Sequence, residues 1–436
     1  MKLKELLIQG LKKRKATKIH LLDLLEKPCA AEHMYRLKST PSESYFREGE
    51  VLRPLVEKEF LKTLRKYFKG AYSERFEAIE EPILFGKYVY VDVLGAMDGS
   101  LVVPIYTNGT PSPSAMMHLA ARVAGIAYGG EHHEAYLLLV CREKADFSLY
   151  RIFKPFGPPT SEFDEVKDDC LYLEGIMEGK VGADGIGSEC IVCKFSESCT
   201  VAEKFEAKPY SFPGGSSTYG SDQTRELSQV STYLYNLKYQ DDGRNTGKLS
   251  PSEMSISKCD LRMAYKLMKK PREASIPASL RKIFDIGHAV HEVIQGILHK
   301  ESDEFLSEQK ASVAGTSIEG SCDGNLNGEG LEIKSIGSKG FKKLRSPKTD
   351  HKKQGAIYAM GLGLKEMLYV YYNKKNGELA FYTEHHKPQE RSEAVVRALE
   401  IEDAVRRGEL PKAAPGWGCR TCAYAWFCEH APKKVF

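Results

Sequence analysis

The chain has 436 residues, a net charge of +4 and 42% hydrophobic residues. This length exceeds what one small core needs and predicts two or three domains. The net charge is too small to indicate a nucleic-acid-binding protein, so only local clusters of basic residues could do so. No early apolar run resembles a signal peptide, and no stretch approaches the roughly 20 apolar residues that span a bilayer. We therefore expect a cytoplasmic protein with no membrane segment.

The eleven cysteines carry the strongest pattern in the sequence. Without an export signal, cysteines are more typical of thiols or metal ligands than of a disulfide framework. Eight of the eleven fall into two matching sets, each with one cysteine far upstream of a C-x2-C-x5-C run. The first set is Cys29, Cys190, Cys193 and Cys199, and the second is Cys259, Cys419, Cys422 and Cys428. Because the distances within the two sets are nearly equal, they predict a tandem duplication.

The duplication also predicts the domain boundaries. We expect a first domain over residues 1–205, a linker over 206–245 that includes a stretch rich in Gly and Ser, and a second domain over 246–436. Each cysteine set would join the start of its domain to the end, which stabilises the fold as closing a long loop does. Four thiolates suit either Zn²⁺ or an iron–sulfur cluster, and the spacing leaves both open.

Chemistry-bearing residues follow Cys259 in a fixed order. Residues 281–299 have helical periodicity and contain His291. A strand is expected over 331–335, where Glu332 and Lys334 share one face. Asp323 lies nine residues before Glu332, a separation that a hairpin can close.

Two carboxylates that meet at strand ends are hard ligands for Mg²⁺ or Mn²⁺. A neighbouring lysine can help to deprotonate water and offset charge on an attacked phosphate, and a helical histidine can complete the metal site. Further on, Gln354 and Tyr358 share a helical face. Each feature alone is more typical of an ordinary strand or helix surface than of a site, and only their order predicts an active site.

That order resembles the RecB-like branch of the PD-(D/E)XK nuclease superfamily, more narrowly the members with an iron–sulfur staple, which include AddB subunits and CRISPR-associated adaptation exonucleases. The resemblance covers residues 250–431. It implies α/β domains, each with a mixed central sheet flanked by helices and closed by a cysteine staple. By resemblance, His291, Asp323 and Glu332 bind the metal, Lys334 assists the water, and Gln354 and Tyr358 support the site and the DNA strand. It also favours 4Fe-4S clusters over zinc.

A basic segment connects the predicted strand to the predicted helix. Residues 337–353 contain seven basic side chains and one acid. Next to a metal site, such a segment suits a phosphate backbone, although it is also typical of a solvated loop. The predicted DNA-binding residues are Lys339, Lys342, Lys343, Arg345, Lys348, Lys352 and Lys353.

The first copy lacks most of this chemistry. Asp92 falls at the place of Asp323, whereas Pro104 and Tyr106 fall at the places of Glu332 and Lys334. The remaining counterparts of the active-site residues are Arg53, His118 and Arg122. One aspartate cannot build a hard-metal site, so we expect this copy to be a catalytically inactive scaffold, clamp or pseudo-dimer partner.

These patterns predict a metal-dependent DNA exonuclease of recombination, repair or phage-type DNA processing, acting on DNA ends or single strands and served by a helicase or recombination partner. One alternative is a non-catalytic DNA- or partner-binding scaffold with two metal staples. Another is a pair of zinc modules without a nuclease fold.

Overall fold

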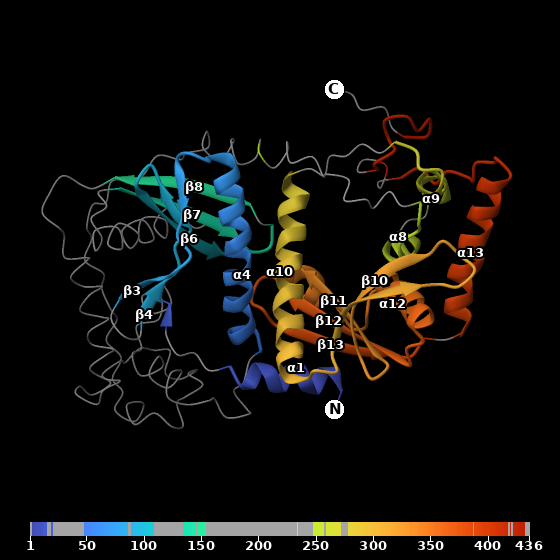
Figure 1. The fold of residues 1–436 in the computed structure, drawn as a ribbon, viewed down its shortest axis with the longest axis horizontal. Helices are drawn as coiled ribbons and strands as arrows, with labels where there is room; N and C mark the ends of the chain where they lie inside the picture. Colours follow the sequence, from blue (N-terminus) through green and yellow to red (C-terminus); the bar gives the residue numbers. More distant parts are fainter. Residues whose placement is uncertain are drawn as a thin grey trace, which may run out of the picture. The chain divides into compact units, whose positions relative to one another are not determined.

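The computed structural model describes residues 2–14, 19–20, 48–85, 89–108, 134–144, 146–153, 233, 247–256, 259–271, 278–386, 388–416, 419 and 422–431. The chain divides into two compact units (Figure 1). One consists of Met1–Leu11, Glu48–Val56 and Leu234–Phe436, and the other of Lys12–Arg47 and Glu57–Tyr233. The predicted linker over 206–245 lies outside the described residues except for Tyr233.

The unit that holds the C-terminal half is built on a mixed five-stranded sheet of order β13-β12-β11-β10-β9. Its strands are β9 (Leu306–Ser312), β10 (Glu319–Leu326), β11 (Glu329–Ile336), β12 (Glu366–Asn373) and β13 (Leu379–Glu384). Only β11 and β12 are parallel, and all other neighbours are antiparallel. A parallel pair needs a crossover connection, which here contains α11 (Ser338–Lys342) and α12 (Thr349–Leu362).

Helices cover both faces of this sheet. The helix α10 (Ala278–Glu301) packs on β10 and β11, and α12 packs on β9 to β12 from the other side (Figure 1). The elements α8 (Pro251–Ile256) and α13 (Pro388–Arg406) lie beside α12, and α9 (Asp260–Leu267) packs on α13. The mixed sheet with flanking helices agrees with the expected fold class, and the helix, hairpin and strand predicted around the site residues are confirmed.

The side chains of β11 alternate between the two faces of the sheet. Leu331 and Ile333 are fully buried on one face, while Glu332 and Lys334 point to the opposite face. The neighbouring β12 is apolar or aromatic on both faces and almost completely buried, as expected of a strand covered by helices on each side.

The N-terminal helix α1 (Leu3–Lys12) belongs to the same unit. The backbone N–H of Leu3 donates to Glu329 Oε2 at 2.8 Å, and Gly10 lies so close to α10 that an added Cβ would be 2.5 Å from Ile297 Cγ2. Residues far apart in the sequence therefore complete one core.

The other unit contains a second five-stranded sheet, of order β2-β5-β6-β7-β8. Its strands are β2 (Phe76–Ala78), β5 (Gly95–Met97), β6 (Ser100–Thr107), β7 (Glu134–Cys141) and β8 (Phe147–Phe153). Here β6 and β7 are parallel and the other neighbours antiparallel. The succession of strand directions is thus the same as in the sheet from β9 to β13. In each case a 24-residue helix precedes the sheet in the chain, α4 (Glu48–Ala71) or α10.

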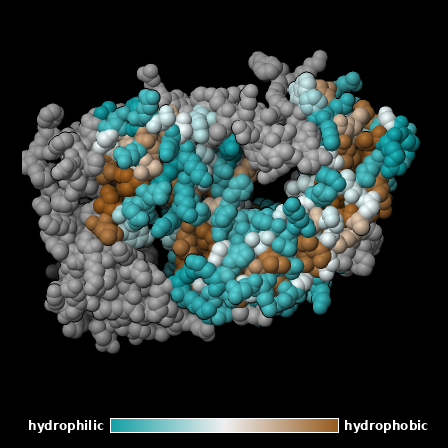
Figure 2. Space-filling model, in the orientation of Figure 1, coloured by the Kyte–Doolittle hydropathy of each residue, from teal (hydrophilic) through white to brown (hydrophobic). Residues whose placement is uncertain are grey.

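A small sheet completes the second unit, with β1 (Ile19–His20), β4 (Val89–Val91) and β3 (Ile83–Phe85) in that order. Some apolar side chains are exposed on the unit that holds the C-terminal half, for example Val396 and Leu399 of α13. Brown, hydrophobic surface is visible on this unit in Figure 2. Among the described residues, none of the helices combines the length and apolar character needed to cross a membrane.

A pair of glycines tests how closely α12 approaches the sheet. A Cβ on Gly355 of α12 would lie 2.0 Å from Tyr369 Oη of β12, whereas one on Gly296 of α10 would meet nothing within 4 Å. We expect Gly355→Ala to destabilise the fold by about 1–3 kcal/mol because the packed core must shift. Gly296→Ala should stabilise it by up to about 1 kcal/mol through helix propensity. Urea unfolding of both variants checks this, and equal effects of the two changes would contradict the close packing of α12.

Candidate active site

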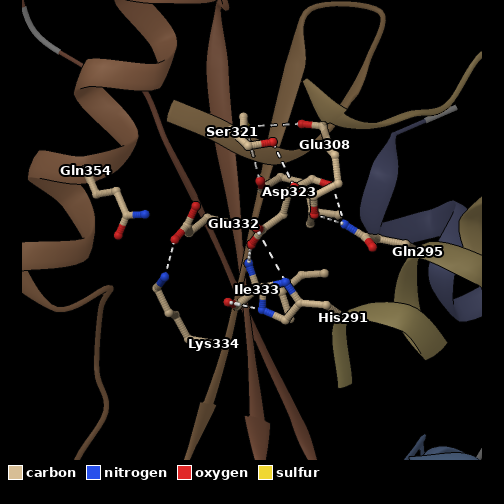
Figure 3. A network of polar contacts seen from close by, with 12 residues as sticks. His291, Gln295, Glu308, Ser321, Asp323, Glu332, Ile333, Lys334 and Gln354 are labelled. Atoms are coloured by element: carbon tan, nitrogen blue, oxygen red, sulfur yellow. Dashed lines mark hydrogen bonds and ion pairs between the residues drawn. The ribbon is translucent and has the colours of Figure 1, made fainter. Parts of the chain in front are cut away.

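The predicted acids meet on neighbouring strands. Asp323 of β10 directly precedes Gly324, which pairs with Leu331, and Glu332 of β11 directly follows Leu331. The two carboxyl groups therefore come from adjacent positions in the middle of the sheet, as Figure 3 shows. The backbone N–H of Ile333 donates to Asp323 Oδ2 at 2.6 Å and fixes the orientation of that carboxyl group.

Glu332 is buried with very little compensation. Its exposed fraction is 1%, its carboxylate is ion-paired with Lys334, and no described residue donates a hydrogen bond to its Oε2. Buried carboxylates are costly to ionise. Burial raises the pKa of Asp323 and of Glu332 to about 7, although Lys334 opposes the rise in both.

Lys334 supplies the positive charge of this site. Burial alone would lower its pKa, but the carboxylates of Glu332 and Asp323 outweigh that effect and hold the pKa of Lys334 above its usual value. The amine is therefore protonated at neutral pH and stays beside Glu332 (Figure 3).

His291 projects from α10 toward the same place. Its Nε2 lies 3.1 Å from Ile333 O, and its Nδ1 lies 3.4 Å from Asp323 Oδ1. A carbonyl oxygen can only accept, so Nε2 must carry the proton in that bond. Burial lowers the pKa of His291, which favours the neutral ring. The lone pair of Nδ1 then faces a carboxylate oxygen, an arrangement that a cation between them would satisfy.

One further carboxylate, which the sequence motifs do not predict, joins these residues. Glu308 of β9 accepts hydrogen bonds from Gln295 Nε2 at 2.9 Å and from Ser321 Oγ at 2.7 Å. One ligand atom each of His291, Glu308 and Asp323 lie within 4.8 Å of one another, the only such group of His, Cys, Asp or Glu among the described residues. The alternating polar pattern of β9 could have suggested Glu308, but it suggests Gln309 and Lys310 equally well.

These donors fit a divalent cation. The group combines two carboxylates with an imidazole nitrogen, and the orphaned Oε2 of Glu332 is a further oxygen ligand close by. Of the predicted ligand set, His291 and Asp323 lie in the three-residue group. Glu332 instead contacts Lys334 on the side toward Gln354 (Figure 3).

The predicted helix residues cover this side of the sheet. Gln354 and Tyr358 of α12 are both buried, and Gln354 Nε2 donates to Tyr358 Oη at 3.2 Å. Burial raises the pKa of Tyr358, so the phenol stays protonated. At the start of α12, Tyr371 Oη accepts from the backbone N–H of Lys348 and lies 2.7 Å from His351 Nδ1.

The basic segment follows β11 directly and begins with α11, which buries no residue. Six of its seven basic side chains are exposed or partly exposed: Lys339, Lys342, Lys343, Arg345, Lys348 and Lys353. The seventh, Lys352, is half-buried and forms an ion pair with Glu384 at 2.6 Å. Arg345 Nη1 also donates to two backbone carbonyls of its own segment, which holds it at the surface.

The second cysteine set gathers around one aromatic cluster. Cys259, Cys422 and Cys428 pack against Leu261, Tyr265 and Tyr424. The fourth, Cys419, is linked through its carbonyl to the N–H of Cys422. None of these four described cysteines is part of a disulfide. Among these described residues no three sulfur atoms lie within 4.8 Å of one another, whereas a tetrahedral Zn–S site requires sulfur separations of about 3.8 Å.

The strand β6, which forms the parallel pair of the other unit, carries no such chemistry. The residues of β6 include neither an acid nor a base. Tyr106 Oη donates to the carbonyl of Glu57 at 2.9 Å, so Tyr106 faces α4, whereas Lys334 faces away from α10. The sequence-based alignment of these two residues is therefore off by one position. His118, Arg122 and the first cysteine set (Cys29, Cys190, Cys193, Cys199) lie outside the described residues.

The chain is only weakly similar to known proteins. No family model matches the chain, and no curated protein matches it. Among solved structures, SSO0001 is 18% identical, with a TM-score of 0.33 over 47% of this chain and 97% of that one. An alkaline exonuclease, LHK-Exo from Laribacter hongkongensis, is 13% identical, with a TM-score of 0.31 over 41% of this chain and 93% of its own. Its complex with dAMP is 14% identical, with a TM-score of 0.31 over 40% and 93%. Because these TM-scores are low, only the geometry of the site supports a function.

The raised pKa values predict how cation binding depends on pH. Asp323 and Glu332 are protonated below about pH 7 and ionised above it, and a cation competes with those protons. We therefore expect the affinity for Mn²⁺ to rise about tenfold or more between pH 6 and pH 8. Calorimetric titration at both pH values measures this. An affinity that is equal at the two pH values would contradict the role given to these carboxyl groups.

Proposed function

We propose that this protein is a Mg²⁺- or Mn²⁺-dependent deoxyribonuclease, an exonuclease of the RecB-like PD-(D/E)XK type. The observation that carries the proposal is the convergence of Asp323, Glu332 and Lys334 beside His291 in the middle of a mixed sheet. A protein that only bound DNA would gain nothing from burying a carboxylate almost without compensation.

Each of these side chains has a role in phosphodiester hydrolysis. His291, Asp323 and Glu332 would hold the cation, which when bound polarises the phosphate and activates water. Lys334 is held protonated by Glu332, so its charge can stabilise the negative charge that develops on the attacked phosphate. Gln354 and Tyr358 cover this face from α12 and support the position of Glu332 and the DNA strand.

The basic segment supports DNA as the substrate. It leaves β11 just beyond Lys334 and carries six basic side chains that reach the surface. Contacts of this kind bind the phosphate backbone without reading sequence. Digestion from DNA ends rather than at internal sites, a pathway in recombination or repair, and a helicase partner are expectations from family resemblance.

The proposal includes the tandem duplication. The two five-stranded sheets have the same succession of strand directions, and each follows a 24-residue helix. Because β6 lacks an acid and a base, the copy within residues 1–205 would be an inactive scaffold. The copy within 246–436 would be the active one, completed by Met1–Leu11 and Glu48–Val56.

A 4Fe-4S cluster held by Cys259, Cys419, Cys422 and Cys428 is also part of the proposal. The cysteines of α9 and of the C-terminal segment share one aromatic cluster, so a group bound there would tie the two ends of the domain together. The preference for a cluster over a single zinc ion follows the family resemblance, since four thiolates suit either group. A matching cluster on the first cysteine set is proposed from the spacing in the sequence alone.

The decisive experiment is digestion of end-labelled single- and double-stranded DNA with Mg²⁺ or Mn²⁺. We expect Glu332→Gln and Lys334→Ala each to lower the cleavage rate about 100-fold or more, because each removes charge that stabilises the transition state. Lys375→Ala, in the exposed β12–β13 turn, is the matched control and should cleave like the wild type.

The same ladders give the polarity of digestion. If the wild-type protein binds DNA but cuts it with neither cation, the proposed nuclease activity is overturned. The alternative, a non-catalytic scaffold, would then be favoured. Cleavage that survives in both site variants would place the chemistry elsewhere in the chain.

Colour and metal content test the cysteine staple. Protein purified without oxygen should be brown and contain iron, and Cys422→Ser should lose both and unfold at a lower temperature, since the closed loop stabilises the domain. Cys322→Ser is the control, because Cys322 is a buried thiol of β10 that donates to backbone carbonyls. A colourless wild type that contains zinc would contradict the cluster.

A further inference from the structure

Glu308 has a backbone conformation that its position in a strand does not explain. Its φ is +51°, in the left-handed region that residues other than glycine rarely adopt. The ladder between β9 and β10 pairs Cys322 with Gln309 and Gly324 with Ser307, but it omits the pair Asp323 and Glu308 between them. Strained residues of this kind persist where surrounding contacts hold them, and they gather at functional sites.

Polar contacts hold the side chain of Glu308 beside the candidate cation site. Gln295 Nε2 donates both to Glu308 Oε1 at 2.9 Å and to the backbone carbonyl of Asp323 at 2.8 Å, so one buried amide joins the two acids. Ser321 Oγ holds the other oxygen of Glu308 (Figure 3). Each carboxylate oxygen keeps a second lone pair.

Glu332 lies apart from the group formed by His291, Glu308 and Asp323. Glu332 is ion-paired with Lys334, and its carboxylate is not part of the group of ligand atoms within 4.8 Å. A cation on His291, Asp323 and Glu308 meets two carboxylates with no lysine among them. Glu332 still interacts electrostatically with Asp323 and His291, and its Oε2 accepts no hydrogen bond from the described residues.

We propose that Glu308 is a ligand of the divalent cation, and that His291, Glu308 and Asp323 form its primary site, with Glu332 at the edge toward Lys334. This inference deepens the proposed function and rests on it. The left-handed conformation of Glu308 is then what brings a carboxylate from the first strand of the sheet to an active site otherwise built from α10, β10 and β11.

Mn²⁺ binding to the full chain tests the proposal without DNA, by electron paramagnetic resonance of free Mn²⁺. We expect Glu308→Gln to weaken binding roughly tenfold or more, because the charge is lost. The amide oxygen can still accept from Gln295, and the amide NH2 can donate to Ser321 Oγ, which also accepts. The matched control is Glu304→Gln, an exposed acid just before β9 whose carboxylate accepts a hydrogen bond from Asn327. It should bind Mn²⁺ like the wild type.

A second variant separates ligation from a structural role. Asparagine adopts the left-handed region more readily than glutamate, so Glu308→Asn should keep the melting temperature of metal-free protein and lose most of the rise that Mn²⁺ gives to the wild type. Melting of metal-free Glu308→Asn well below the wild type, with the full Mn²⁺-dependent rise retained, would overturn the proposal.

The outcomes also separate this inference from the proposed function. Equal Mn²⁺ affinity of Glu308→Gln and wild type, together with loss of cleavage in Glu332→Gln, would overturn the role of Glu308 and leave the nuclease standing. A wild type that binds no Mn²⁺ would overturn both.

Discussion

The burial of the Glu332 carboxylate against Lys334 is the constraint on which the rest of the site depends. An ionised carboxylate in the middle of a sheet costs free energy unless charge or hydrogen bonds compensate it. Lys334 compensates only one side of Glu332, and its Oε2 accepts no hydrogen bond from the described residues. The parallel pair of β11 and β12 requires a crossover, and α12 of that crossover covers the acid and excludes water from it.

The two five-stranded sheets show that the strand arrangement does not depend on charged residues in the central strand. They have the same strand directions although β6 and β11 differ at every polar position. Buried apolar side chains stabilise both central strands, so exchange of Glu and Lys for Val, Pro, Ile or Tyr removes a site without removing the strand.

The cysteine set and the acids of the candidate site lie in different parts of one unit. The acids sit where α10 and α12 sandwich the sheet, whereas the cysteines join α9 to the C-terminal segment around Tyr265 and Tyr424. Binding a group at the cysteines would fix the ends of the chain and leave the cation site to the sheet. Damage to one site should thus be separable from damage to the other, by stability in one case and by cation binding in the other.

The sequence by itself determined the order His291, Asp323, Glu332, Lys334, Gln354 and Tyr358, and the helices and strands that carry them. It also placed Glu332 and Lys334 on the same face of β11. It could do so because the periods of helices and strands are local properties. It did not single out Glu308, and it misaligned Tyr106 with Lys334 by one residue. Both depend on which face of a strand meets a helix, and for Glu308 on a left-handed residue that interrupts the ladder. Only tertiary contacts decide which face of a strand meets a helix. The alternating polar residues of β9 look alike in the sequence, so the sequence does not indicate which of them faces the site.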